Sequence, residues 1–484
     1  MKKLIELLSQ ESNYQSFGNL SDKYVKGFSQ DSRKLSDGLV YVARKGAKND
    51  GHEYIDQVIQ KGINIILCES MPVTLYEDVC YIRTDHLNSL LASMLNEFYN
   101  HPTDRIKLVG ITGTNGKTSV ATLLYDLFES LGYKAGLIST IKNKIHNLEI
   151  ASTHTTPEII SLYELISRMD TMECDYVFME VSSHAIDQAR IEGLKFSVAV
   201  FTNLTQDHLD YHHTMLNYIY AKKKFFDHLD KSAYALVNDD DKNGNVMIQN
   251  TRAKVLSYSL KQPSNYRSKI LDSGFQGMQI KYKDREWHTH LLGEFNAYNL
   301  TAVIGVAEIF NISTDEILEK LSLVKPVEGR FDWIYSTASQ KYGVVDYAHT
   351  PDAIEKILKN LNSIRKNTQR IICVMGCGGN RDKEKRPIMG RIAAANSDQL
   401  ILTSDNPRDE DPHEIIREIE AGINNDYKAK VLQIEDRTQA IRTASAISQK
   451  GDIVLIAGKG HENYQEIKGV KYPFNDKQIL KEIL

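Results

Sequence analysis

An apolar run enters a glycine-rich turn at residues 106–118, IKLVGITGTNGKT, and an amphipathic stretch of helical length follows. The turn is Gly113-Thr114-Asn115-Gly116-Lys117-Thr118, continued by Ser119. Such glycines let backbone N–H groups face a phosphate, the lysine adds a point charge, and the threonine hydroxyl can coordinate Mg²⁺. The strict pattern GxxxxGK[ST] would place glycine at Ile111, whereas this chain has Gly110 one position early. The strand–turn–helix context favours a phosphate-binding loop over an ordinary glycine-rich turn.

Apolar runs of strand length alternate with helix-length amphipathic stretches around this loop. They occupy residues 106–111, 134–140, 176–181, 196–204 and 235–237. Because the runs are apolar at successive positions, we expect strands of a mostly parallel sheet that is covered by helices on both faces. Residues 249–287 alternate polar and apolar side chains, which predicts a short antiparallel addition.

The 484 residues suggest about three domains. We expect strands at residues 39–43 and 63–68 and helices at 54–61 and 89–99. A domain boundary is expected at His101-Pro102, where a helix is disfavoured. A second alternating series, with strands expected at 343–346, 370–375, 399–403, 430–434 and 452–457, follows a hinge-like segment at 324–330. We therefore expect an α/β protein with domains at residues 1–102, 103–328 and 329–484.

The composition excludes several classes of protein. Lys and Arg total 59 against 63 for Asp and Glu, a net charge of −4, so nothing suggests binding to nucleic acid or an anionic membrane. No apolar run approaches the roughly 18 residues of a membrane span, and no export signal is visible. The five cysteines include no CxxC pair, which favours neither a disulfide framework nor a zinc site. We expect a cytoplasmic protein without membrane insertion.

Two further polar side chains follow expected strands. Glu180 ends the run at 176–181, and His208 follows the run at 196–204. Ligands gather at the carboxyl edge of such a sheet, beside the loop. With the Thr118 hydroxyl, these groups could hold Mg²⁺ near a terminal phosphate. The alternative is that Glu180 caps a helix and the nearby histidines lie on the surface.

Six motifs, in this order, resemble the Mur ligases, which are ATP-dependent amide-forming enzymes of peptidoglycan synthesis. Besides the loop they are Thr155-Thr156-Pro157, Glu180-Val181-Ser182-Ser183-His184, Asp207-His208-Leu209-Asp210, Asp346-Tyr347-Ala348-His349-Thr350-Pro351 and Gly458-Lys459-Gly460-His461-Glu462. The resemblance runs from Asp31 to Glu462. It implies an N-terminal domain for a UDP-linked substrate, a central P-loop ATPase domain with a parallel sheet, and a C-terminal Rossmann-like domain for an amino acid. The chain departs from the family pattern at Asn380, where Asp is common, and at His213, where Gly is common.

The resemblance also implies the chemistry. A carboxylate acylates an amine only after its oxygen becomes a good leaving group, so ATP first phosphorylates a UDP-linked muramoyl dipeptide, and the amine of a diamino acid then attacks the acyl phosphate. The implied catalytic residues are Lys117, Lys222, His208 and Glu180. Lys222 would carry a CO₂-derived carbamate and would join Thr118, Glu180 and His208 around Mg²⁺. From helical spacing alone, Lys222, Lys223 and Lys224 could instead form a basic helix face.

Two ligand sites follow from the same resemblance. ATP is expected to meet the loop from Gly113 to Ser119 and, from elsewhere in the chain, Asn296, Asn299, Arg330, Asp346 and His349. The UDP-linked substrate is expected to meet Ser32, Thr155, Thr156, Ser182, Gln188 and Arg190. Taken singly, residues of the second set are more often caps or turn residues. Contributions to the ATP site from both sides of the hinge imply that the domains close.

Asp405-Asn406-Pro407-Arg408 resembles the signature of family members that take meso-2,6-diaminopimelate. A guanidinium at Arg408 would grip the second carboxylate, which lysine lacks. The implied pocket consists of Arg381, Asp405, Asn406, Arg408, Gly458 and Glu462, with Glu462 facing an ammonium. Arg408 could instead form a surface salt bridge with Asp409 or Glu410. The alternatives are L-lysine or lanthionine as the amine, a folate polyglutamylating enzyme, and a catalytically silent nucleotide-binding homologue. We expect a monomer.

Overall fold

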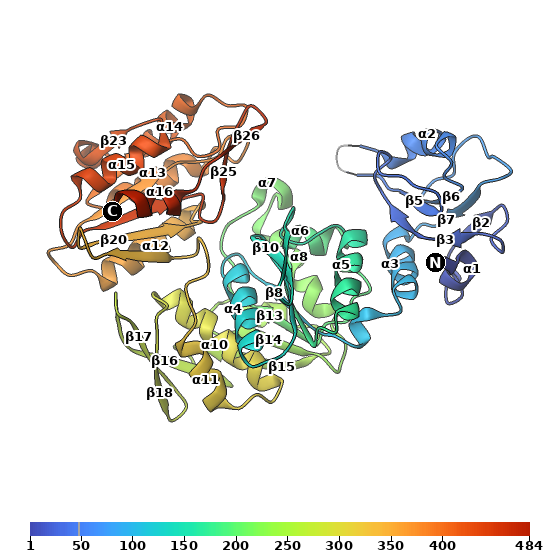
Figure 1. Ribbon diagram of the computed structural model, residues 1–484, viewed down its shortest axis with the longest axis horizontal. Coiled ribbons are helices and arrows are strands. Elements are labelled where there is room, and N and C mark those ends of the chain that lie inside the picture. The colour runs from blue at the N-terminus through green and yellow to red at the C-terminus, as the bar shows by residue number, and fades with distance from the viewer. Residues whose placement is uncertain (47–48) are drawn as a thin grey trace. The chain divides into compact units, whose positions relative to one another are not determined.

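The structure is a computed structural model that describes residues 1–46 and 49–484. Figure 1 shows the helices and strands along the chain. Contacts within the chain divide it into two compact units. The first consists of Met1–Gly110, Tyr133–Val198 and Leu229–Ala233, and the second of Ile111–Gly132, Ala199–His228 and Tyr234–Leu484. This division does not follow the three expected domains, whose bounds stay a prediction.

The first unit begins with a five-stranded sheet in the order β2-β7-β6-β5-β4, which is parallel except for β2. Strands expected at 39–43 and 63–68 are present as β5 and β6. The elements of this segment are β1 (Lys2–Lys3), α1 (Leu4–Leu7), β2 (Gln15–Phe17), β3 (Tyr24–Val25), β4 (Gly27–Ser29), β5 (Leu39–Ala43), η1 (Gly51–Tyr54), α2 (Ile55–Gln60), β6 (Ile65–Cys68), β7 (Cys80–Arg83), α3 (Leu87–Phe98) and η2 (Pro102–Asp104).

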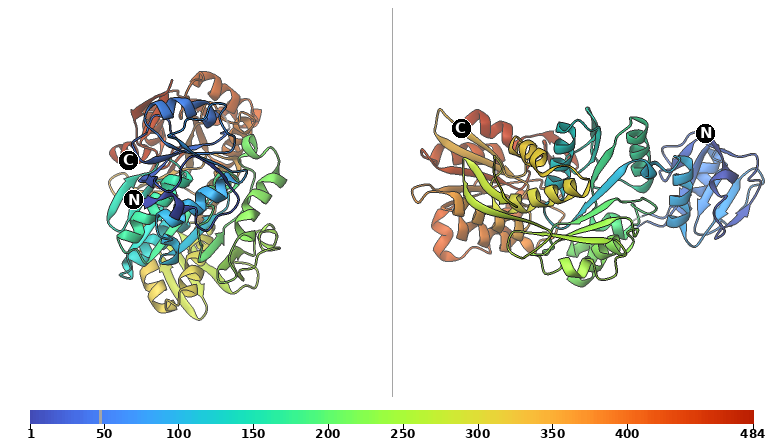
Figure 2. Two further views of the ribbon diagram at one scale, coloured as in Figure 1. Left: turned by 90° about the vertical axis from the view of Figure 1, so that its right-hand side faces the viewer. Right: turned by 90° about the horizontal axis from the view of Figure 1, so that it is seen from below.

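Both faces of this sheet are buried, as its continuous apolar strands require. On one face Val40, Val42 and Leu67 contact α1 and α3, and on the other Tyr41 and Ile66 contact α2. The N-terminal sheet and α3 are blue in the two views of Figure 2.

The first unit also holds β9, β10, β11 and β12. β12 pairs with β9 in parallel, while β9-β10-β11 is an antiparallel run that the sequence did not predict. The elements are β9 (Ala135–Ile138), β10 (Lys142–Ile145), β11 (Leu148–Ala151), α5 (Ile159–Thr171), β12 (Tyr176–Glu180) and α6 (Ser183–Asp187). Strands β8 (Lys107–Thr112) and β13 (Val198–Phe201) each belong partly to both units.

In the second unit, β14, β15 and β16 pair in parallel, and β16, β17 and β18 form an antiparallel meander. This meander confirms the antiparallel addition expected within residues 249–287. The buried helix α10 (Glu294–Ile309) contacts β14, β15 and β16. The other elements are α4 (Lys117–Ser130), α7 (Leu209–His212), α8 (Met215–Asp227), β14 (Tyr234–Asn238), α9 (Gly244–Met247), β15 (Lys254–Ser259), β16 (Tyr266–Gly274), β17 (Gly277–Tyr282), β18 (Arg285–Thr289) and α11 (Thr314–Ser322).

The C-terminal part of the second unit is a six-stranded sheet in the order β19-β20-β24-β21-β22-β23, parallel except for β19. All five strands expected here are present. The elements are β19 (Asp332–Ser336), β20 (Lys341–Asp346), α12 (Pro351–Ile364), β21 (Ile371–Met375), α13 (Lys385–Asn396), β22 (Gln399–Leu402), α14 (Pro412–Glu420), η3 (Asn425–Lys430), β23 (Val431–Gln433), α15 (Arg437–Ile447), β24 (Ile453–Ala457), β25 (Tyr464–Ile467), β26 (Val470–Pro473) and α16 (Asp476–Ile483).

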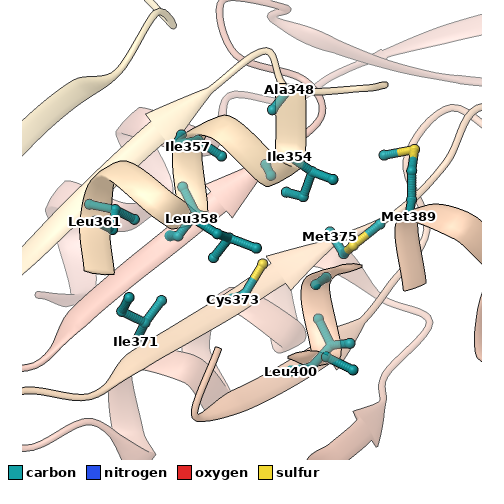
Figure 3. Close-up of a cluster of buried hydrophobic side chains, with 14 of the residues drawn as sticks. Ala348, Ile354, Ile357, Leu358, Leu361, Ile371, Cys373, Met375, Met389 and Leu400 are labelled. Carbon is teal, nitrogen blue, oxygen red and sulfur yellow. The ribbon is translucent and has the colours of Figure 1, made fainter. Parts of the chain in front are cut away.

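Helices cover both faces of this sheet. Figure 3 shows Ile354 and Leu358 of α12 beside Cys373 of β21, within a core that also includes residues of α13 and α14. Ile372 and Val374 point to the other face, against α15 and α16. Thr350 begins α12 by accepting a hydrogen bond from the Ala353 N–H, and a proline follows at the first helical position.

The five cysteines (Cys68, Cys80, Cys174, Cys373 and Cys377) are all buried thiols. None forms a disulfide in the described part of the chain. Within residues 1–46 and 49–484, no helix combines the length and the apolar character that a membrane span needs.

Candidate active site

The loop before α4 has the geometry of an anion cradle. Gly116 precedes the helix with φ +90°, and Gly113 has φ +150°. A Cβ at Gly113 would lie 1.9 Å from the Thr202 hydroxyl oxygen, and one at Gly116 would lie 2.7 Å from Asn299 Oδ1. Both positions therefore require glycine, and the loop forms although the earlier glycine stands at 110 rather than 111.

Side chains that follow β13 hold this loop in place. The Asn115 N–H donates to Asn203 Oδ1 at 3.0 Å, and the hydroxyl of Thr202 donates to the Asn115 carbonyl at 2.6 Å. The hydroxyls of Thr114 and Tyr218 lie 3.0 Å apart. The sequence did not predict that Thr202, Asn203 and Tyr218 hold the loop, because they lie about ninety to a hundred positions from the loop residues they contact.

Two lysines converge on one carbonyl of the loop. Lys117 Nζ donates to the Gly113 and Thr114 carbonyls, each at 2.9 Å, and Lys222 Nζ donates to the Gly113 carbonyl at 3.0 Å. Lys222 is 1% exposed and lies over the Tyr218 ring. Burial, and then the charge of Lys117, lower the pKa of Lys222 well below its ordinary value. Both effects favour the uncharged form of the Lys222 amine.

The alternative of a basic helix face is wrong. Lys222 and Lys223 are both buried, and Lys223 forms an ion pair with Asp227, one turn along α8. Lys224 is exposed. Only one of the three lysines therefore faces solvent.

Asn296 and Asn299 are buried on α10 beside the loop. Asn299 Nδ2 donates to Asn296 Oδ1 at 3.2 Å, and Asn296 Nδ2 donates to the Leu292 carbonyl at 2.8 Å. Asn299 Oδ1 lies 2.7 Å from where a Cβ at Gly116 would stand, so this asparagine pair packs against the loop.

Residues from beyond the hinge also reach the loop. Arg330 Nη2 donates to the Thr118 hydroxyl oxygen at 3.1 Å, and its guanidinium lies 4.6 Å from the centre of the Tyr347 ring. Its buried Nε has no hydrogen-bond partner among the described residues. Asp346 accepts a hydrogen bond from the Phe331 N–H, and burial raises its pKa to about 6 against the opposing charge of Arg330.

His349 lies in the same segment. Its Nδ1 donates to the Tyr347 carbonyl at 2.7 Å, which leaves Nε2 as the acceptor of the neutral ring. Burial is the main cause that lowers the pKa of His349, so the ring is uncharged at neutral pH. The structure thus brings Asp346 and His349 close to Arg330, and their part in binding ATP stays a prediction.

Asp352 is a residue of this site that the sequence interpretation missed. Its Oδ2 accepts hydrogen bonds from Asn115 Nδ2 at 2.9 Å and from the Thr205 hydroxyl at 3.0 Å. Asp352 directly follows the motif at residues 346–351. Its position next to that motif was the one feature of the sequence that could have indicated a role in the site.

His208 precedes α7 in a left-handed backbone conformation, φ +54°. Its N–H donates to Asp207 Oδ1 at 2.9 Å, and its Nε2 lies 3.5 Å from Asp207 Oδ2. His213, where the family pattern has glycine, also has a positive φ of 64°. Asn380, the second departure, has φ +54°, a conformation that asparagine adopts more readily than most residues.

The expected acceptor pocket gathers where β21, β22 and β24 end. Arg408 Nη1 donates to the Gly379 carbonyl at 2.7 Å, and its Nε lies 3.3 Å from Glu466 Oε2. The alternative partners of Arg408 are wrong, because Glu410 pairs instead with the buried Arg386 and Asp409 accepts from Asn380. A Cβ at Gly378 would touch both Arg408 and Arg381, so the two guanidinium-bearing side chains border one loop.

Asn406 and Glu462 meet in the same pocket. Asn406 Nδ2 donates to Glu462 Oε2 at 2.7 Å. Gly458 has φ +119°, and a Cβ there would lie 2.5 Å from Asp405 Oδ2. Burial would raise the pKa of Asp405, but Lys459 and Arg437 hold it below its ordinary value. The carboxylates of Asp405 and Glu462 therefore face a region that can accept a cation.

The residues expected around the UDP-linked substrate lie in the first unit, and most of them form one cluster. The Thr156 hydroxyl donates to the Glu180 carbonyl, and the Ser182 N–H donates to that hydroxyl. Arg190 donates to the Thr156 carbonyl and to Gln188 Oε1. The Thr140 hydroxyl donates to Thr155 Oγ1.

Glu180 and Ser32 have different settings. Glu180 is 1% exposed, and its Oε1 accepts from the Thr140 N–H at 2.7 Å. It belongs to the first unit, whereas Thr118, His208 and Lys222 belong to the second. Ser32 stands in a turn in which its carbonyl accepts from Lys61 Nζ, and no described contact joins it to the Thr155–Arg190 cluster.

Fold and loop together define a phosphate-loop nucleotide-binding α/β protein with an added C-terminal α/β sheet. Comparison with known families agrees. Residues 24–99 match the Mur ligase family catalytic domain, 111–307 the Mur ligase middle domain, and 329–460 the Mur ligase glutamate ligase domain. This chain belongs to the Mur ligase family.

Curated relatives are similar over nearly the whole chain. The UDP-N-acetylmuramoyl-L-alanyl-D-glutamate–2,6-diaminopimelate ligase of Phocaeicola vulgatus is 50% identical over 459 residues, 95% of each chain. The protein of the same name from Bacteroides fragilis is 48% identical over 481 residues, 99% of each. A solved structure of a ligase of that name has a TM-score of 0.70 at 30% identity, covering 99% of this chain and 98% of its own.

Proposed function

We propose that this chain is the ATP-dependent, ADP-forming ligase that adds meso-2,6-diaminopimelate to UDP-N-acetylmuramoyl-L-alanyl-D-glutamate during peptidoglycan precursor synthesis. The convergence of Lys117 and Lys222 on the Gly113 carbonyl is the observation that carries the proposal. A lysine in that place can hold the terminal phosphate, and an amine beside it whose pKa is lowered by burial can be modified. The names of the relatives supply the substrates.

The first step is phosphoryl transfer from ATP to the D-glutamyl carboxylate of the dipeptide. The carboxylate oxygen attacks the γ-phosphorus, the bond to the bridging oxygen breaks, and ADP leaves. The loop N–H groups and Lys117 bind the phosphates, and Arg330, which reaches Thr118, adds positive charge where negative charge develops. Asn296, Asn299, Asp346, His349 and Ser119 complete the proposed ATP site.

The second step forms the amide. The amine attacks the acyl phosphate carbonyl, and the tetrahedral intermediate collapses with loss of inorganic phosphate and a proton. The protein aligns the two reactants and keeps water away from the acyl phosphate. Thr155, Thr156, Ser182, Gln188, Arg190 and Ser32 are the proposed contacts of the UDP-linked substrate.

The proposed metal residues are Thr118, Glu180, His208 and Lys222. No group of three His, Cys, Asp or Glu side chains able to hold a metal occurs among residues 1–46 and 49–484. Mg²⁺ usually takes one or two protein ligands together with phosphate oxygens and waters, so hydroxyl and carboxylate donors of this kind fit it. When bound, Mg²⁺ supplies Lewis-acid stabilisation of the phosphates.

Lys222 supports the carbamate part of the proposal. Carbamate formation needs an unprotonated amine that attacks CO₂, with one proton released. The lowered pKa and the burial of Lys222 provide that amine. The product would place an anionic oxygen next to the loop, where Lys117 would balance its charge.

The acceptor pocket supports a diamino diacid. Arg408 and Arg381 border the loop at Gly378, and contacts join Asp405 to Gly458 and Asn406 to Glu462 in the segments that follow β22 and β24. Guanidinium groups suit a distal carboxylate, and the acidic side suits an ammonium. Lanthionine carries the same groups and remains the competing acceptor.

The remaining parts of the proposal concern organisation and location. We place the domains at residues 1–102, 103–328 and 329–484, as a monomer whose C-terminal domain closes over the ATP loop. We place the reaction in the cytoplasm, where ATP is available and where five buried thiols stay reduced.

The decisive experiment incubates the protein with the UDP-linked dipeptide, ATP, Mg²⁺ and a panel of acceptors, and measures product mass. The proposal expects ADP release and amide product with diaminopimelate. Hydroxylamine in place of the acceptor should trap the acyl phosphate as a hydroxamate, which a silent nucleotide-binding protein would not form. Equal incorporation of L-lysine would overturn the assignment of the acceptor.

A further inference from the structure

Lys459, in the motif at residues 458–462, has no part in the reaction described above, yet it is the most completely buried charge of the acceptor pocket. It stands two residues after the end of β24 and is 0% exposed. Its Nζ lies 2.8 Å from Asn406 Oδ1, 3.2 Å from Glu462 Oε2 and 3.6 Å from Asp405 Oδ1. A buried ammonium destabilises the fold unless it is paired and hydrogen-bonded. These three contacts provide that compensation.

Lys459 fixes the orientation of the Asn406 amide. Asn406 Oδ1 accepts from Lys459 Nζ and from the Glu466 N–H at 2.9 Å. Because both of these partners are donors, the amide nitrogen must point the other way, where it donates to Glu462 Oε2. Lys459 therefore holds Glu462 Oε2 in two ways. Its ammonium donates to that oxygen directly, and it orients the Asn406 amide that donates to the same oxygen.

The charges of this cluster do not balance. Lys459 contributes one positive charge against two negative charges from Asp405 and Glu462. Arg437, the next nearest cation, is engaged by Asp476 through two contacts of 2.8 Å. One negative charge remains, and Glu462 is the more exposed of the two carboxylates.

The second oxygen of Glu462 is the one left to meet a ligand. Oε1 keeps a long contact of 3.5 Å with the Tyr347 hydroxyl, whereas Oε2 has both strong partners. An attacking amine must be uncharged, with its lone pair available. A cation held by Oε1 is therefore the other, non-reacting amine of a diamino acid.

We propose that Lys459 is a positioning residue that holds Glu462 with one oxygen turned toward the non-reacting ammonium of the acceptor, and so selects diamino over monoamino acids. This inference rests on the proposed function. It assigns selection for the second amine to the Lys459–Asn406–Glu462 cluster, separately from selection for the second carboxylate at Arg408.

Two acceptors and two variants test the inference. meso-Diaminopimelate carries the second amine, and 2-aminopimelate lacks it while keeping both carboxylates. In Lys459→Met, kcat/KM with diaminopimelate should fall at least ten-fold, mainly through KM. With 2-aminopimelate it should change less than two-fold. Lys341→Met is the matched control, because Lys341 donates to the Ser445 carbonyl in the same sheet domain and should leave the preference unchanged.

The outcomes separate the inference from the function on which it rests. If the wild-type protein forms no hydroxamate and no amide, the proposed function fails. If the wild-type protein is active and Lys459→Met keeps the wild-type preference within two-fold, the inference is wrong. Should Lys459→Met not fold, Glu462→Gln with Lys459 intact must show the same loss for diaminopimelate, and an unchanged preference there would overturn it.

Discussion

Asp352, in the first turn of α12, accepts a hydrogen bond of 2.9 Å from the side chain of Asn115 in the phosphate loop. The two residues are 237 positions apart, and the contact ties the loop to the C-terminal sheet domain. The carboxylate also accepts from the Thr205 hydroxyl and pairs with Lys356.

Asp352→Ala should slow the use of ATP, because Asn115 loses a charged hydrogen-bond partner. Such a bond contributes about 1.5–3 kcal/mol, so kcat/KM for ATP should fall roughly ten-fold or more. Initial rates of ADP release at a series of ATP concentrations give kcat/KM for ATP in each variant. Glu355→Ala, which removes a surface pair with Lys359 on the same helix, is the control. Equal kcat/KM values for Asp352→Ala and Glu355→Ala would show that the hydrogen bond between Asp352 and Asn115 does not support the use of ATP.

Lys117→Ala should nearly abolish both half-reactions. Removal of one preorganised charge from a site of phosphoryl transfer costs about 10²–10³-fold in rate. Hydroxamate formation and ADP release both report it. Lys107→Ala, an exposed lysine on the strand before the loop, should retain wild-type rates. Undiminished amide synthesis by Lys117→Ala would contradict the whole mechanism.

Lys222 should carry a carbamate. Because burial lowers its pKa well below the ordinary value, the unprotonated amine that attacks CO₂ is favoured. Activity should fall when CO₂ is purged from the buffer and return with bicarbonate. A ¹³C-bicarbonate label should give a carbamate signal in the wild type and in Lys223→Met, but none in Lys222→Met. A signal that persists in Lys222→Met would assign the modification elsewhere.

Arg408→Lys should reduce the preference for diaminopimelate over L-lysine. A guanidinium that loses its planar pairing with a carboxylate forfeits about 1–3 kcal/mol, roughly 10- to 100-fold in the ratio of kcat/KM values. The two acceptors in direct competition measure that ratio. Arg417→Lys, on the exposed face of α14, should leave it unchanged. An unaltered ratio in Arg408→Lys would show that another residue reads the distal carboxylate.

Glu410 should stabilise the fold in a pH-dependent way. The hydrogen bond from buried Arg386 is the largest cause that lowers its pKa to about 2 from 4.5. A carboxyl whose folded pKa is depressed contributes stability above its unfolded pKa and loses it as the pH falls through the folded one. Because solvent screens this pair, its contribution to the free energy of unfolding is about 1–2 kcal/mol. That contribution is present at pH 7 and declines between about pH 4.5 and 2.

Urea unfolding of Glu410→Gln measures this contribution. The variant should lose about 1–2 kcal/mol at pH 7, and the difference from the wild type should shrink toward pH 3. Glu414→Gln, which removes a surface pair with Arg417, should change the free energy of unfolding by about 0.5 kcal/mol or less. A pH-independent loss in Glu410→Gln would point to packing rather than charge.

The sequence predicted the elements whose physical pattern is strong. The strands β8 and β21 are apolar at successive positions, and the structure buries both of their faces. The hairpins β10–β11 and β25–β26 were missed, because each strand has only four residues and mixes polar and apolar side chains without a continuous apolar run. Such strands form through pairing with a neighbour, which no local pattern reveals.

The site divides in the same way. Lys117 and Thr118 could be predicted because a short motif contains both the loop and its charge. Asp352 and Arg386 could not, because their roles depend on partners that only the tertiary structure brings near. Lys459 was visible within a motif, but its three contacts with Asn406, Asp405 and Glu462 depend on the tertiary structure.

The buried thiols give each compact unit an internal reporter. Burial raises the pKa of Cys68 and Cys80 to about 11 in the first unit and of Cys373 and Cys377 to about 12 in the second. A maleimide reacts with an accessible thiolate, so it can reach these sulfurs only while the surrounding segment is transiently open. Labelling followed by peptide mapping would therefore time the opening of the two units separately, in the unmodified enzyme and without any introduced probe.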